Sequence, residues 1–175
     1  KELSNVEGII KVEESLILQE KAKKFFKSRL KNILVKNKKI LTKDIKFGKK
    51  IQFENNNYDF LIDCTAGHLF NKKKFDISYE PRVTWVYRSK LKNFALMAMD
   101  GNFFNIFPYK KNEYVLGTPK YSKFKKFINL NSAYNFIKKI KKSVVNKRKL
   151  LSEKIVKESF ANFNKFFKYK GYYFS

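Results

Sequence analysis

The sequence has 175 residues, with 40 Lys or Arg and 15 Asp or Glu, and therefore a formal net charge of +25 and a pI near 10. Its apolar fraction of 43% is typical of a folded globular protein and argues against disorder. The single cysteine excludes an internal disulfide and a cysteine-rich zinc cluster, and no apolar run reaches the length of a membrane span. We therefore expect a cytoplasmic globular protein.

The positive charge comes almost entirely from lysine, because only Arg29, Arg82, Arg88 and Arg148 are arginines. Sites that recognise phosphates or bases rely on the planar five-donor guanidinium, whereas lysine contributes a point charge. Lysine occurs here together with abundant Phe, Tyr, Asn and Ile, the residues with AT-rich codons. We therefore attribute much of the charge to compositional bias and expect only non-specific binding to polyanions.

The first part of the chain contains one helix pattern and several short strand patterns. Residues 9–12 form an extended apolar segment, and apolar residues over 18–33 recur at three- and four-residue steps, which predicts an amphipathic helix. Short strands are predicted at 39–42 and 50–54, and the asparagine-rich run "ENNNYD" predicts a hairpin turn. The run "FLIDC" over 60–64 begins with three consecutive apolar residues, which predicts a central strand buried on both faces.

The second part of the chain contains four strand-like runs, "RVTWVYR", "FALMAM", "FFNIFPY" and "NEYVLGT", separated by gaps too short for a helix. Short gaps between strands predict antiparallel pairing, so 82–118 is interpreted as a meander. Ser132 is predicted to cap a helix that extends to Val144, and a last helix is predicted from about Ser152 to Phe167. The predicted fold class is therefore mixed α/β.

The stretch "YDFLIDCTAGHLF" holds the only cysteine, Cys64, and the only histidine, His68. The two side chains are candidates for a nucleophile and its general base. A cysteine directly after an apolar run is more typical of a small buried hydrophobic residue with a raised pKa. We therefore interpret Cys64 as structural and His68 as a surface or cofactor-side residue, and we predict no metal site because no second His or Cys is present.

The order of "EGIIKVEESLIL", "NNYDFLIDCTAGHL", "YEPRVTWVYR", "FALMAMDGNFFNIFPYKKNEYVLGT" and "FNKFFKYKGYYFS" resembles the FAD-dependent oxidoreductases of the D-amino-acid oxidase and glycine oxidase superfamily. The resemblance implies part of an FAD-binding Rossmann-like domain over 1–78, an antiparallel-sheet substrate domain over 79–130, and C-terminal helices with the start of a returning strand over 131–175. It also implies that Thr65, Ala66 and Gly67 approach the FAD, although Ala66 is an insertion relative to the family pattern.

The glycine fingerprint of such proteins does not occur in this sequence. A Gly-x-Gly-x-x-Gly turn holds the FAD pyrophosphate at a helix N-terminus, and the six glycines here are too far apart to form one. We therefore interpret the chain as a fragment that lacks its cofactor grip, and we expect it to be colourless and inactive alone. The resemblance implies that the parent enzyme oxidises an amine-like or related small donor by hydride transfer to flavin.

The resemblance places the substrate pocket on the meander. Its aromatic and basic residues are either pocket walls or core, because successive strand residues point to opposite faces. Asp100-Gly101 predicts a tight hairpin turn that sets Met99 opposite Phe103, so that one of Phe103 and Phe104 lines the cavity and the other lies in the core. Arg88 is a candidate anchor for a substrate carboxylate. The substrate-pocket candidates are Trp85, Tyr87, Arg88, Phe103, Phe104 and Tyr109.

Two other function classes remain open. The segment "KGYYF" at 170–174 superficially matches the start of an RNA-recognition strand, although Tyr173 occupies a position that should be small. The chain is alternatively a non-catalytic remnant of an oxidoreductase fold. Sequence-selective binding at physiological salt would distinguish the first alternative from the second.

Overall fold

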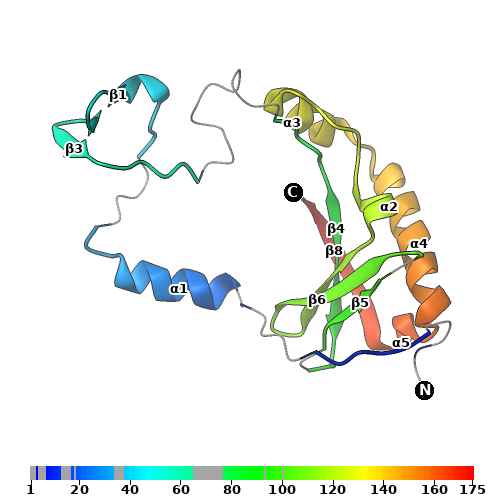
Figure 1. The fold of residues 1–175 in the computed structure, drawn as a ribbon. Helices are drawn as coiled ribbons and strands as arrows, with labels where there is room; N and C mark the ends of the chain where they lie inside the picture. Colours follow the sequence, from blue (N-terminus) through cyan, green and yellow to red (C-terminus); the bar gives the residue numbers. More distant parts are fainter. Residues whose placement is uncertain are drawn as a thin grey trace.

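The computed structural model describes residues 3, 7–12, 17, 19–33, 38–64, 77–92, 94–99 and 101–175. These residues include several helices and two separate antiparallel sheets, which Figure 1 shows coloured in chain order. The predicted mixed α/β class is confirmed at this level. No described helix is long and apolar enough to cross a lipid bilayer.

The first part of the chain contains a helix and a small three-stranded sheet. Its elements are α1 (Gln19–Arg29), the 3-10 turn η1 (Thr42–Asp44), β1 (Ile45–Phe47), β2 (Ile51–Phe53) and β3 (Asn56–Tyr58). The strands pair in the order β1-β2-β3, and Glu54 adopts a positive φ in the tight turn between β2 and β3. The predicted helix and the strand at 50–54 are therefore present, whereas 39–42 leads into η1 and forms no strand.

The prediction of a buried central strand over 60–64 is wrong in this structure. The segment is extended but belongs to neither sheet, and Phe60 and Ile62 are 87% and 84% exposed. Cys64 is also exposed. Burial on both faces requires neighbouring strands and covering helices, and the described residues supply neither to this segment.

The second part of the chain forms a five-stranded antiparallel sheet. Its strands are β4 (Val83–Ser89), β5 (Leu96–Ala98), β6 (Phe104–Lys110), β7 (Glu113–Gly117) and β8 (Phe167–Phe174), in the order β5-β6-β7-β4-β8. The predicted antiparallel arrangement over 82–118 is confirmed, but β4 pairs with β7 and β8 and does not form a hairpin with β5. The C-terminal strand therefore joins the same sheet as the meander.

Four helices connect β7 to β8: α2 (Pro119–Ser122), α3 (Leu130–Lys139), α4 (Lys142–Ser159) and α5 (Phe163–Phe166). Asn129, and not Ser132, caps α3, because its side chain accepts hydrogen bonds from the backbone N–H groups of Asn131 and Ser132. The chain leaves helical geometry at Ile140 before α4 begins. The last helix, predicted from about Ser152, is the second half of α4 and ends at Ser159; the short α5 follows, and Phe167 begins β8.

One core unites the five-stranded sheet with these helices. Figure 1 shows α4 lying along one face of the sheet. Side chains of β4, β6, β7, α4, α5 and β8 meet there, including Val83, Trp85, Tyr87, Phe104, Leu116, Val156, Phe163 and Phe167. The C-terminal strand and helices thus share one sheet and one core with the strands of the meander.

Candidate functional site

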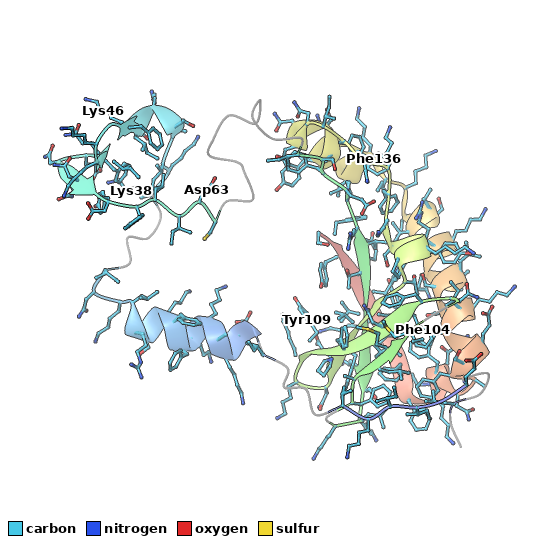
Figure 2. All side chains as sticks on the ribbon, in the orientation of Figure 1. Lys38, Lys46, Asp63, Phe104, Tyr109 and Phe136 are labelled. Atoms are coloured by element: carbon cyan, nitrogen blue, oxygen red, sulfur yellow. The ribbon has the colours of Figure 1, made fainter. Side chains whose placement is uncertain are left out.

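The alternation of side chains in the sheet divides the six substrate-pocket candidates between its two faces. Trp85, Tyr87 and Phe104 are at most 1% exposed and lie on the face that the helices cover. Arg88 and Tyr109 lie on the other face, and Phe103 is half-buried on that side by alternation with Phe104. Figure 2 shows Phe104 and Tyr109 on opposite sides of the sheet. The three core residues are therefore inaccessible to a ligand.

The face of the sheet away from α2–α5 is called here the open face. Strand register arranges its side chains in three rows. The first row runs Met97, Asn105, Gly117, Thr84 and Tyr173, the second Phe107, Val115, Val86 and Gly171, and the third Lys110, Glu113, Arg88 and Lys168. The open face is therefore polar at one end, apolar in the middle and charged at the other end.

Two tyrosines form a bridge across the open face. The rings of Tyr109, on β6, and Tyr173, on β8, stack with centroids 5.7 Å apart and an interplanar angle of 25°. Because β7 and β4 lie between these strands, their backbones are about 14 Å apart, and the two side chains must reach toward each other over the intervening strands. Val86 of the second row is only 8% exposed, although none of the described helices lies on this face. The bridge gives the face a sheltered apolar centre.

The third row carries an excess of positive charge. Glu113 pairs across the sheet with both Arg88 and Lys110, and Lys170 donates a hydrogen bond to its carboxylate. This hydrogen bond, with Coulombic attraction to Lys110 and Arg88, lowers the pKa of Glu113. Lys168 lies beside Arg88 on β8. Three cations therefore act on one carboxylate and Lys168 lies nearby, so this end of the open face favours a bound anion.

Asn105 and Gly117 form a close pair in the first row. A Cβ atom built on Gly117 would lie 2.5 Å from Asn105 Oδ1, so the amide occupies the space that a side chain would fill. The missing side chain thus lets the amide lie flat against β7, where it presents a donor and an acceptor to the open face.

We predict that Gly117→Ala will destabilise the protein by at most about 1 kcal/mol, because the new methyl group must displace the Asn105 amide, which is the end of a flexible side chain. Adding Asn105→Ala should restore most of the lost stability, since the double variant has no side chain to displace. Urea unfolding of the two single variants and the double variant measures this coupling. Additive effects of the two substitutions would contradict the close contact.

On the covered face, buried polar groups join the sheet to α4. The Tyr87 hydroxyl donates to Glu153 Oε1 over 2.7 Å, and Lys149 Nζ lies 3.1 Å from the same oxygen. Burial, and then the hydrogen bond to Glu153, raises the pKa of Tyr87. The hydroxyls of Thr118 and Ser152 form a second buried contact of 2.6 Å. These buried contacts hold α4 against the sheet, and a ligand cannot reach them.

Thr65, Ala66 and Gly67, which the resemblance assigns to FAD, lie outside the described residues, as does His68. The structure therefore does not test whether Cys64 and His68 form a nucleophile–base pair. The three-stranded sheet carries an apolar cavity of about 180 Å³, lined by Ile40, Ile45, Ile51, Phe53, Tyr58, Phe60, Leu61 and Ile62. Tyr58 supplies the one polar group among these lining residues, and no carboxylate, amine or thiol lines the cavity.

The described residues do not fit the pyrophosphate of FAD. Its cradle requires a glycine-rich turn that leads into a helix, so that backbone N–H groups meet the phosphates. Among the described glycines, Gly8, Gly48, Gly101, Gly117 and Gly171, only Gly117 lies just before a described helix, the four-residue α2, and no second glycine stands near it to complete the turn. Nor do these residues include three His, Cys, Asp or Glu side chains grouped to hold a metal ion.

Comparisons with protein families, with curated proteins and with solved structures found no match to this chain. The residues of the open face therefore have to be interpreted from their own geometry.

Several open-face residues were not among the sequence candidates. Asn105, Gly117, Lys168 and Tyr173 belong to the face only because distant strands pair in this register. One local signal was available: a glycine inside the strand-like run "NEYVLGT" indicates a close approach by a neighbour. The partner that approaches Gly117 cannot be read from a local pattern.

Proposed function

We propose that this chain supplies the substrate-binding sheet of an FAD-dependent oxidoreductase that oxidises an amine-like or related small donor by hydride transfer to flavin. The observation that carries the proposal is the open face, which combines a sheltered aromatic centre with a cationic end. Binding sites for small molecules are typically apolar with a few placed polar groups, and the open face has this composition. The flavin itself would have to be held by residues other than those described.

In this proposal, Arg88 binds the anionic end of the donor. Arg88 is exposed, and the carboxylate nearest to it in the sheet, Glu113, is already bonded by Lys170. A guanidinium can therefore offer two parallel N–H donors to a ligand carboxylate. The Tyr109–Tyr173 bridge would shelter the apolar part of the donor from water, and the Asn105 amide would bind a polar group at the far end.

The test compares Arg88 of β4 with Arg82, which directly precedes that strand. Binding of D-phenylalanine to the purified chain should be followed by NMR titration, with phenethylamine as the matched ligand that lacks the carboxylate. We predict that Arg88→Lys weakens D-phenylalanine binding by about tenfold, because lysine cannot form the bidentate pair. Arg82→Lys is the control, since Arg82 already pairs with Glu80 at 3.1 Å and lies at the other end of β4.

D-phenylalanine should shift the backbone NMR signals of open-face residues in β4, β6 and β8. Phenethylamine should not shift these signals to a comparable extent. Equal binding of the two ligands, or equal loss from the two arginine variants, would contradict the role of Arg88. Shifts confined to the helices would place the ligand elsewhere and contradict the proposed function.

A second candidate is binding of single-stranded nucleic acid, because aromatic rings beside lysines are typical of such surfaces. The stacked tyrosines and the cationic row support it. The match of "KGYYF" does not support it, since Tyr172 pairs with Trp85, Phe174 pairs with Val83, and both pack against the covered core. In an RNA-recognition strand, those two positions would stack on bases.

We predict that poly(U) binds only at low salt and is released as salt rises, because dispersed lysines bind phosphates through counterion release. Fluorescence anisotropy over a salt series measures the slope. Tyr173→Ser should change this weak binding little. If the wild type instead binds poly(U) tightly at high salt and Tyr173→Ser abolishes that binding, the nucleic-acid function is favoured over the oxidoreductase.

A further inference from the structure

The segment that leads from the end of β7 into the first part of α4 carries charged side chains of one sign. Residues 118–152 contain ten lysines and one arginine but no Asp or Glu. Nine of these lysines are exposed, namely Lys120, Lys123, Lys125, Lys126, Lys138, Lys139, Lys141, Lys142 and Lys147. We call these nine the lysine surface. Within the lysine surface, Lys123 forms an ion pair with Glu80 at 3.8 Å.

The arginine within this stretch is used inside the fold. Arg148 Nη1 donates to the backbone carbonyls of Tyr121 and Lys123, at 2.8 and 2.9 Å. Its guanidinium also lies 4.3 Å from the ring centroid of Phe124. The lysine surface therefore presents point charges without a free planar fork, and it suits a diffuse anionic surface better than specific recognition of single phosphates.

An apolar side chain projects from the same surface. Ile128 is 88% exposed, and Tyr134, on the first turns of α3, is 53% exposed. The backbone beside Ile128 is fixed, because Phe127 and Tyr79 exchange two backbone hydrogen bonds of 2.7 and 2.8 Å. Asn129 caps α3 on the other side. Ile128 is thus an exposed apolar side chain that follows Lys125 and Lys126 in the chain and lies between two hydrogen-bonded neighbours.

We propose that the lysine surface binds an anionic lipid bilayer as a peripheral contact. Lysines gain electrostatic energy near anionic headgroups, and an apolar side chain gains energy by entering the interface beneath them. Ile128 is the inserted residue, and Tyr134 lies at headgroup level. Because α4 and the open face lie on opposite sides of the sheet, the open face would point away from the bilayer (Figure 1). The inference does not depend on the proposed oxidoreductase function.

The experiment is flotation of the full chain with vesicles of phosphatidylcholine containing about one third phosphatidylglycerol, compared with pure phosphatidylcholine. Ile128→Ser, which keeps the charge, should weaken binding to the anionic vesicles by about tenfold. Its matched control is Ile10→Ser, since Ile10 is also 88% exposed. The double variant Lys138→Gln/Lys142→Gln should weaken binding by about fivefold per lysine, against Lys43→Gln/Lys46→Gln as control.

Each outcome decides the proposal. Binding to anionic vesicles that depends on Ile128 but not on Ile10 supports a bilayer contact. Equal effects of the two isoleucine variants, or no preference for anionic vesicles, overturn it. A poly(U) competition identifies the other polyanion: if poly(U) remains bound at a salt concentration that releases the vesicles, the lysine surface is a nucleic-acid surface and the proposal is wrong.

Discussion

Replacing Phe104 with alanine should lower the free energy of unfolding by about 3–5 kcal/mol, because a large buried ring is lost and a cavity remains. Phe104 is 1% exposed and lies in the core between the sheet and α4. It begins β6 opposite Ala98, and the small alanine side chain cannot fill the space that the phenylalanine ring would leave. Urea unfolding followed by circular dichroism measures the change.

The adjacent residue provides the matched control. Phe103 is half-buried on the open side of the sheet, and Phe103→Ala should cost less than about 1 kcal/mol, as at other partly exposed sites. The same variant should alter binding of D-phenylalanine if the open face is the ligand site. Similar losses of stability at the two positions would show that the division of the two faces is wrong.

Phe103 and Phe104 also show what the alternation of side chains in a strand can predict. The period of two in "FFNIFPY" predicts that one of Phe103 and Phe104 lies in the core, and the structure places Phe104 there. The face that the helices cover is decided elsewhere, by Val145, Ile155 and Val156 of α4. A strand pattern therefore predicts which residues share a face, but the covering helix decides which face is buried.

Long-range pairing explains most of the remaining differences. Local runs predicted antiparallel strands, but the position of β4 between β7 and β8 depends on distant partners, as in the pair Trp85 and Tyr172, whose numbers differ by 87 (172 − 85). The extended run at 60–64 illustrates the opposite case. Its apolar pattern predicts a buried strand, whereas burial needs partners that a local pattern cannot specify.

Tyr87→Phe should lower the free energy of unfolding at neutral pH by about 1.5–3 kcal/mol, the usual effect of losing a hydrogen bond to a charged group. Tyr87 is 1% exposed, and its hydroxyl is the sheet's donor to Glu153 of α4. Without it, Glu153 keeps the Lys149 contact but loses its link to the sheet. Tyr134→Phe makes the same chemical change at an exposed position and should have little effect.

The pH dependence of stability distinguishes this hydrogen bond from simple packing. Burial and the bond to Glu153 raise the pKa of Tyr87 in the folded protein, whereas an unfolded tyrosine ionises near pH 10. The contribution of Tyr87 is therefore fully present below about pH 10 and is lost as pH rises, since the folded state then binds one more proton than the unfolded state. Above about pH 10, the stability of the wild type should fall by about 1.4 kcal/mol per pH unit more steeply than that of Tyr87→Phe. The two proteins differ only at residue 87, so the difference between the two slopes reports on Tyr87. Parallel slopes would mean that the hydroxyl ionises as readily in the folded protein as in the unfolded chain, and the buried link between β4 and α4 would then be absent.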